Sequence, residues 1–210
     1  MKKVFKYTCM AVLMAMTACT DYNVIDTGIA DENTHGNRTM MEYFKTDPYN
    51  WDSLRVMINH AELADVFEGK GQYGDKITVL GMTNHSIRRY MLSEGYEKIT
   101  DIPAETCKEL ILDAIIPEYL LLETFPEGRP SKDVETVIGT GGKMYTMLSG
   151  KQLWIYTFHD SYNGVLEAGP LRVNIVSPDT EKRSVVGSHN IKTRTGVVHS
   201  LSYDFTPKDF

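Results

Sequence analysis

The residues of this chain that could do acid-base or metal chemistry are six histidines and scattered carboxylates, and their spacing favours neither. The histidines stand at positions 35, 60, 85, 159, 189 and 199, none of them with a partner at metal-ligand spacing. His159 and Asp160 are neighbours at the end of a predicted strand, where alternation directs their side chains to opposite faces. The sequence also lacks the H-E-x-x-H zinc pair and the G-x-S-x-G nucleophile turn. We therefore predict no catalytic residue, no metal site and no cofactor.

A glycine-rich run over residues 136–144 is the nearest approach to a phosphate-binding loop. Val137 stands where the first glycine of such a loop is required, and Met144 stands where a hydroxyl would hold magnesium. The run fails both requirements. We interpret it as a hairpin turn between two strands.

Aromatic residues offer a better case for binding. In the predicted strand over residues 152–159, Trp154, Tyr156 and Phe158 share one face. Such a row of rings could stack on sugars or contact a protein, but core packing is the favoured interpretation, because sheets bury aromatic faces routinely. Tyr162 lies in the turn that follows and is expected to be exposed. Trp154, Tyr156 and Tyr162 are the candidate ligand contacts.

Two further reactive side chains are expected inside the fold. His199 shares the apolar face of the predicted final strand, which favours a core histidine with a satisfied hydrogen bond over a catalytic one. Cys107 lies on the apolar stripe of a predicted helix, which indicates an inert buried thiol.

The elements that must position these residues change character along the chain. Helical spacing begins at Trp51, a β-branched strand covers 77–80, Thr83 or Asn84 caps a helix that stops at Gly95, and another helix runs from Pro103 to Pro117. After Pro130 the sequence is rich in strand formers, at 134–138, 143–148, 152–159, 171–176 and 196–205. Helices first and strands later favour an α+β fold over a parallel βαβ repeat.

The N-terminus has the features of an export signal. Lys2, Lys3 and Lys6 precede an uncharged apolar stretch over 7–18, which is too short to span a membrane. The following Met16-Thr17-Ala18-Cys19 resembles a bacterial lipoprotein cleavage box, which implies a lipid on Cys19. A soluble secreted protein cut near Ala18 is the alternative. We predict a signal peptide over 1–18, a lipid-anchored tether over 19–40 and one globular domain over 41–210.

Charge argues against one class of partner. The 22 basic and 28 acidic residues give a formal net charge of −6. Removing residues 1–18 takes away three lysines and no acid, so the mature chain would carry −9. Phosphate-backbone binding needs clustered Lys and Arg. We therefore expect no nucleic-acid partner.

Several segments, taken in order, resemble the fasciclin-type (FAS1) domain. They are Tyr49-Asn50-Trp51 leading to residues 61–67, then Ile77 to Asn84, Leu110 to Pro117, and Gly196-Val197-Val198-His199. The resemblance implies a single α+β domain with a β-wedge and a helical layer, serving extracellular adhesion or carbohydrate-linked binding without known catalysis. Thr83, Asn84, Gly196 and His199 keep the family's structural motifs. The family's usual Ala-Pro is Gly81-Met82 here, and its adhesion Tyr-His pair aligns with Asp113-Ala114, which does not support an integrin-type mechanism.

A lipoprotein box followed by one such domain resembles the cell-envelope lipoproteins of Bacteroidota, where these domains often accompany glycan-uptake systems. The leading hypothesis is a non-enzymatic lipoprotein, anchored through Cys19 in the outer membrane, which binds a glycan or an envelope protein at the cell surface. The alternative is an envelope hydrolase that uses acids such as Asp160, Glu167 or Asp179, and it requires two carboxylates about 5–10 Å apart in a cleft. A structural adhesion module without a small ligand is a third possibility.

Overall fold

The structure is a computed structural model that describes residues 36–132 and 136–210. The predicted signal peptide, Cys19 and the tether as far as residue 35 lie outside the described residues. Thr39 and Met40, which we assigned to the tether, belong to the folded body instead. Thr39 caps the first helix, and Met40 is fully buried. The domain therefore begins before the predicted boundary at residue 41.

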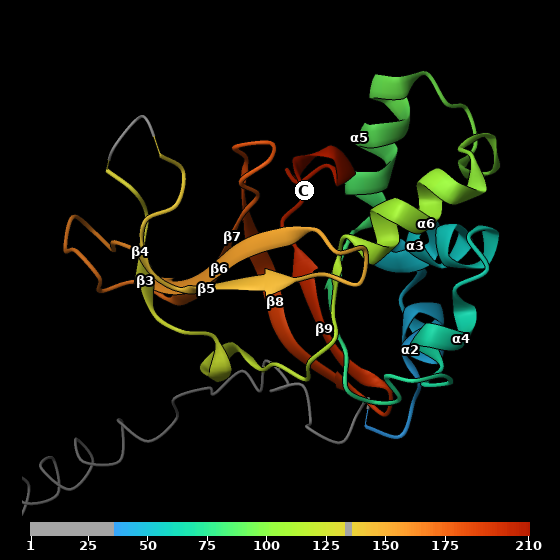
Figure 1. The fold of residues 1–210 in the computed structure, drawn as a ribbon, viewed down its shortest axis with the longest axis horizontal. Helices are drawn as coiled ribbons and strands as arrows, with labels where there is room; N and C mark the ends of the chain where they lie inside the picture. Colours follow the sequence, from blue (N-terminus) through green and yellow to red (C-terminus); the bar gives the residue numbers. More distant parts are fainter. Residues whose placement is uncertain (1–35, 133–135) are drawn as a thin grey trace, which may run out of the picture. The chain divides into compact units, whose positions relative to one another are not determined.

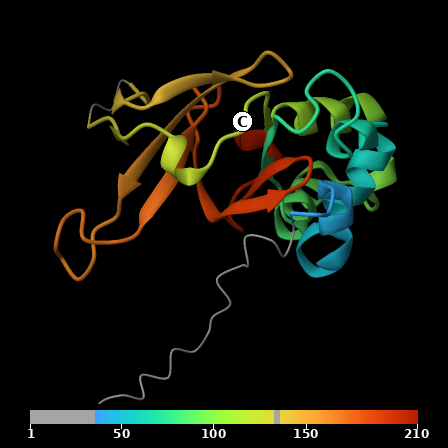
Figure 2. The same cartoon turned by 90° about the horizontal axis from the view of Figure 1, so that it is seen from below.

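Most helices come from the first half of the domain and gather at one end of the sheet (Figures 1 and 2). They are α2 (Met40–Thr46), α3 (Pro48–His60), α4 (Ala64–Phe67), α5 (Asn84–Glu94) and α6 (Ala104–Leu112), with short 3-10 turns η1 (Ile99–Asp101), η2 (Leu122–Thr124) and η3 (Pro207–Asp209).

Local signals explain where these helices begin and end. The Thr83 side chain accepts a hydrogen bond from the Ser86 N–H at the start of α5, and Gly95 ends that helix in the left-handed region at φ 79°. α3 begins three residues earlier than expected, because Pro48 fits the first helical turn and Asp47 caps it. α6 ends at Leu112 instead of running to Pro117.

The strands form a seven-stranded sheet in the order β2-β1-β9-β8-β7-β6-β5 and a separate two-stranded ribbon of β3 and β4. Their bounds are β1 (Thr78–Gly81), β2 (Ile115–Ile116), β3 (Gly128–Arg129), β4 (Thr140–Gly141), β5 (Lys143–Thr146), β6 (Gln152–His159), β7 (Leu171–Val176), β8 (Arg183–Thr193) and β9 (Gly196–Leu201). Only β1 and β9 pair in parallel within this sheet; its other neighbours are antiparallel.

The long strand β8 joins two halves of the sheet. Its first residues pair with β7, and the rest pair with β9 across two register shifts between Val186 and Ile191. Extra residues of this kind bend a strand and increase its twist. The two outer edges of the sheet then approach each other, because the Leu148 N–H donates to the Ile115 carbonyl oxygen at 2.9 Å. The result is a nearly closed wedge.

Four expectations about the strands were wrong. Ile115 and Ile116 form β2 and not the end of α6, since Ile115 pairs with Val79. The glycine-rich run is not a simple hairpin turn; Gly142 links β4 of the ribbon to β5 of the main sheet. β8 was missed, because its centre, over residues 187–190, is polar. The described part of the predicted strand at 134–138 is also irregular.

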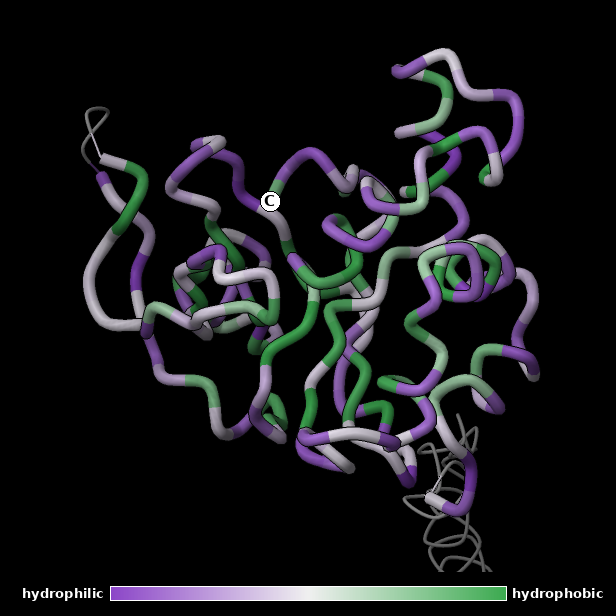
Figure 3. Tube along the Cα trace, turned by 45° about the vertical axis from the view of Figure 1, so that its right-hand side comes forward, coloured by the Kyte–Doolittle hydropathy of each residue, from purple (hydrophilic) through white to green (hydrophobic). Residues whose placement is uncertain are grey.

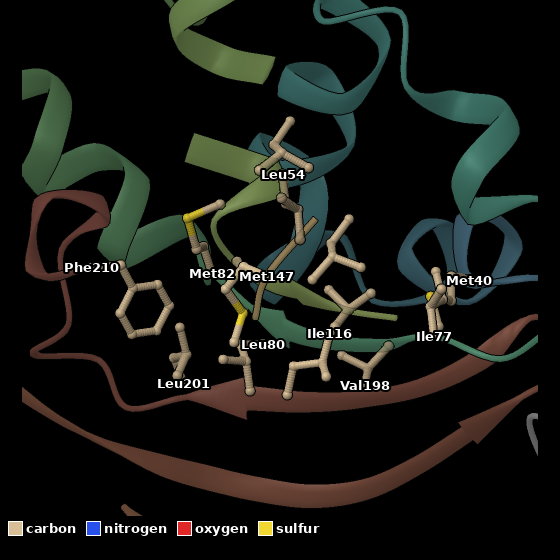
Figure 4. Packing of buried hydrophobic residues seen from close by; sticks show 14 of the residues in the cluster. Met40, Leu54, Ile77, Leu80, Met82, Ile116, Met147, Val198, Leu201 and Phe210 are labelled. Carbon is tan, nitrogen blue, oxygen red and sulfur yellow. The ribbon is translucent and has the colours of Figure 1, made fainter. Parts of the chain in front are cut away.

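One cluster of buried hydrophobic residues joins the helices to the sheet. Figure 3 colours the backbone by hydropathy and shows hydrophobic stretches, in green, along the central strands. The side chains labelled in Figure 4 include Met40 of α2, Leu54 of α3, Leu80 of β1, Ile116 of β2 and Val198 of β9, and further members come from other helices and strands. Burial of these apolar side chains holds the two layers together. The expected fold class, α+β with a β-wedge and a helical layer, is confirmed.

Candidate functional site

The predicted aromatic face of β6 lies inside the protein. Trp154 and Tyr156 are only 2% and 3% exposed, and their rings stack with centroids 4.3 Å apart. The indole N–H of Trp154 donates to the Gly141 carbonyl oxygen at 3.0 Å. An added Cβ on Gly142 would lie 2.5 Å from the Trp154 Nε1, so glycine permits the close approach of the covering segment. These two residues are not available as surface ligand contacts; they form a small second core with Val176.

Tyr162 is the one candidate contact of the three that is exposed, at 62%. It pairs with Val165 across a two-residue turn of Asn163 and Gly164, both at positive φ. Asn-Gly is the sequence that favours such a turn. The turn therefore displays Tyr162 at the tip of the β6–β7 connection.

Two of the three acids of the hydrolase hypothesis, Asp160 and Glu167, lie in the β6–β7 connection and pair with arginines. A groove of about 400 Å³ is lined in part by Glu127, Arg129 and Glu167. Glu167 forms an ion pair with Arg129, and this partner raises the pKa of the guanidinium. Asp160 pairs with Arg172 at 2.6 Å. Asp179 is exposed and does not line this groove. The arrangement gives the hydrolase hypothesis no specific support.

His199 lies in the core with both ring nitrogens in use. Its Nε2 is 2.9 Å from the Leu120 carbonyl oxygen, and its Nδ1 accepts from the Asn190 N–H at 3.4 Å. This pattern fits the neutral Nε2–H tautomer. Burial lowers the pKa of His199 to about 4. The geometry assigns it a structural role.

The remaining motif residues also hold backbone segments together. Thr83 caps α5, while the Asn84 carboxamide reaches α3 and bonds to its backbone at Pro48, Tyr49 and Ser53. Gly196 has φ 135°, and an added Cβ there would lie 2.3 Å from the Ile77 carbonyl oxygen. Only glycine fits where β9 starts beside β1.

A second groove, which sequence reasoning missed, lies where α2 and α3 face β8 and β9. It has a volume of about 350 Å³ and is lined in part by Asp47, Asn50, Ser188, Ser202 and Tyr203. The Asn50 Nδ2 donates to Asp47 at 2.7 Å, and the Tyr203 hydroxyl donates to the Asn50 Oδ1 at 3.3 Å. The groove is thus bordered by side chains already connected to one another.

The floor of this groove is aromatic and buried. Tyr43 and Trp51 are 7% and 2% exposed, and the Trp51 indole N–H donates to the Tyr43 hydroxyl at 3.3 Å. Desolvation raises the pKa of Tyr43. The wall is supplied by Gly187 and Ser188, at the register shifts of β8. Bulges are common beside functional sites, and the polar run over residues 187–190 was the signal that could have indicated one.

No protein-family model matches the chain, and no curated protein matches it. The structure is similar to a FAS1 domain pair. This pair comes from the insect cell adhesion molecule fasciclin I, with a TM-score of 0.45 and 10% sequence identity. The match covers 73% of this chain and 45% of the other, so this chain spans less than half of the matched one.

Two further observations concern the described residues alone. No group of three or more His, Cys, Asp or Glu side chains there is arranged to hold a metal ion. No described helix is both long and apolar enough to cross a membrane.

Proposed function

We propose that this chain is an exported lipoprotein whose single fasciclin-like domain binds a glycan or a protein at the cell surface and catalyses no reaction. The observation that carries the proposal is the groove between α3 and β9. Its border of amide, hydroxyl and aromatic groups can hydrogen-bond and pack against a ligand, which is what a binding site requires. Its one charged lining residue, Asp47, is engaged by Asn50, which leaves no acid and base pair facing the groove.

The anchor is the second part of the proposal. The basic start, the short apolar stretch and Cys19 support lipidation and attachment to the outer membrane. One acyl chain binds a membrane only marginally, whereas several on one cysteine would hold the protein firmly. The lipid would hold the domain near the envelope, so its binding partner would be found there. A glycan-uptake complex is one candidate for that partner.

Cell fractionation of the full chain and of Cys19→Ala tests the anchor. We expect the parent in the membrane fraction, with a lipid mass on the peptide that begins at Cys19, and the variant in the soluble fraction. Unchanged membrane retention without lipid mass would overturn the anchor. Protease treatment of intact cells, compared with a periplasmic control protein, tests surface exposure.

The binding role is tested separately, with the detergent-solubilised full chain on a glycan array and by copurification from crosslinked envelopes. Binding in either experiment supports the proposal, and a negative result in both overturns it. Polysaccharide-hydrolysis assays with Glu127→Gln and Glu167→Gln cover the enzymatic alternative. If the parent hydrolyses a polysaccharide and either substitution abolishes that activity, the protein is a hydrolase and the binding proposal is wrong.

A further inference from the structure

Three exposed rings form a row on the surface beside the groove. Tyr49 lies at the start of α3, His85 at the start of α5, and Tyr203 just after β9. The His85 ring centroid is 6.0 Å from that of Tyr49 and 4.9 Å from that of Tyr203. The tyrosines are 70% and 53% exposed. Residues 36, 118 and 154 positions apart in the chain therefore present one aromatic surface.

Side-chain hydrogen bonds to backbone carbonyl oxygens hold the segments that carry the three rings. The Asn84 side chain donates to the Tyr49 carbonyl oxygen at 2.7 Å, which joins the segments that carry Tyr49 and His85. The guanidinium of Arg89, also on α5, donates to the Asp204 carbonyl oxygen at 2.6 Å and fixes the residue after Tyr203. A surface prepared in this way loses less conformational entropy when a ligand binds.

The row continues into the groove through Tyr203 and Asn50. Tyr203 belongs to both, and its hydroxyl donates to Asn50, the residue next to Tyr49. Ser188 and Ser202 add hydroxyl groups to the lining. Aromatic faces on one side and hydrogen-bonding side chains on the other match a pyranose, which has an apolar C–H face and a rim of hydroxyls.

The charges of the residues that line the groove favour some sugars over others. Asp47 is the one charged side chain among the described residues that line the groove, and no lysine or arginine lines it. Inside the groove an anionic glycan would meet this carboxylate and no lysine or arginine of the lining, whereas a neutral glycan would meet hydrogen-bonding groups. A protein partner would be expected to bury a larger, less polar surface than this narrow groove offers.

We propose that the row of Tyr49, His85 and Tyr203, together with the adjoining groove, binds a neutral oligosaccharide. The rings stack on the C–H faces of the sugars, and Asn50, Ser188 and Ser202 hydrogen-bond their hydroxyls. Because the row and the groove are continuous, more than one sugar unit is in contact. This inference rests on the proposed binding function and names its ligand class and its site.

The test uses the detergent-solubilised full chain on an array of neutral gluco-, manno-, galacto- and xylo-oligosaccharides, with oligogalacturonate and heparin fragments as acidic members. Affinity for any neutral member found is then measured with Tyr49→Ala, Tyr203→Ala and Tyr203→Phe. Each alanine variant should lose about tenfold or more in affinity, and Tyr203→Phe, which keeps the ring, should lose less.

Tyr119→Ala is the matched control, because Tyr119 is also an exposed tyrosine, at 43%, but neither lines the groove nor belongs to the row. It should bind like the parent, and unchanged melting curves should show that all variants fold. Binding of acidic members alone, or neutral binding that survives both alanine variants, overturns this site while the binding function stands. If neither a glycan nor an envelope protein binds, both proposals fall.

Discussion

The side-chain oxygen of Asn84 accepts a 2.7 Å hydrogen bond from the backbone N–H of Ser53. The nitrogen of the same carboxamide donates to the carbonyl oxygens of Pro48 and Tyr49, at 2.9 and 2.7 Å. Tyr49 and Ser53 are four residues apart, the spacing of a helical hydrogen bond. The Asn84 carboxamide therefore bonds to the Tyr49 carbonyl oxygen and to the Ser53 N–H, which are spaced as the acceptor and donor of one helical hydrogen bond. These bonds connect the first residue of α5 to the first turns of α3.

Asn84→Asp should destabilise the domain. The aspartate keeps an acceptor for Ser53 but replaces the donor with a carboxylate that faces two carbonyl oxygens. We expect the free energy of unfolding to fall by about 2 kcal/mol, in urea titrations followed by circular dichroism. Arg88→Ala, an exposed change on the same helix, should stay within about 0.5 kcal/mol of the parent. Equal stability of the two variants would show that the Asn84 bonds contribute little.

Gly81 lies against the buried ring of Trp51, which leaves no room for a side chain. An added Cβ there would lie 2.7 Å from the Trp51 ring, which is buried. Overpacking of this kind typically lowers stability by roughly 1–3 kcal/mol, and we expect that loss for Gly81→Ala in thermal or urea unfolding. Gly187→Ala is the control, since its added Cβ would come no closer than 3.6 Å to any neighbour.

A double-mutant cycle identifies Trp51 as the cause. In a Trp51→Leu background the smaller side chain leaves room for the methyl group, so Gly81→Ala should be less destabilising there than in the parent. If its effect is the same in both backgrounds, the clash with Trp51 is not what excludes alanine.

Sequence reasoning located the elements whose residues carry a local signal. Thr83 and Gly95 bound α5 as a cap and a left-handed stop, and the apolar runs at 152–159 and 171–176 became β6 and β7. Alternation likewise placed His199 in the core. These features depend on neighbours a few residues away, which a single sequence displays.

The candidate site could not be predicted in the same way. Alternation correctly grouped Trp154 with Tyr156 on one face, but it could not tell whether that face would be covered, and the segment that covers it includes Gly128 and Gly142. The groove and the aromatic row join residues more than 30 positions apart. Part of the groove lining comes from Gly187 and Ser188 at the register shifts of β8, a strand whose polar centre hides it from hydrophobic patterning.

Cys107 should be unreactive in the native protein. Its side chain is fully buried, and desolvation raises its pKa to about 11, so almost no thiolate forms at pH 8. Iodoacetamide at that pH should leave the Cys107 peptide unlabelled in peptide maps of the native chain and label it fully in urea. Comparable labelling in both conditions would show that the α6 region opens readily.

Protonation of His199 should destabilise the fold as the pH falls. Burial lowers its folded-state pKa to about 4 from an ordinary value of 6.5. Between these values the unfolded chain binds the proton and the folded chain does not. The stabilising contribution is therefore complete above about pH 6.5 and is lost progressively towards pH 4. A difference of this size corresponds to about 3 kcal/mol at most.

Unfolding titrations from pH 7 to pH 4 check this expectation when the parent is compared with His199→Gln. The amide can still donate toward the Leu120 carbonyl oxygen but does not titrate in this range. The parent's advantage in unfolding free energy should shrink as the pH falls, because the imidazole must either stay neutral or enter the core charged beside Phe125. A difference between parent and variant that stays constant from pH 7 to pH 4 would contradict the lowered pKa, and with it the neutral tautomer that bonds to Leu120 and Asn190.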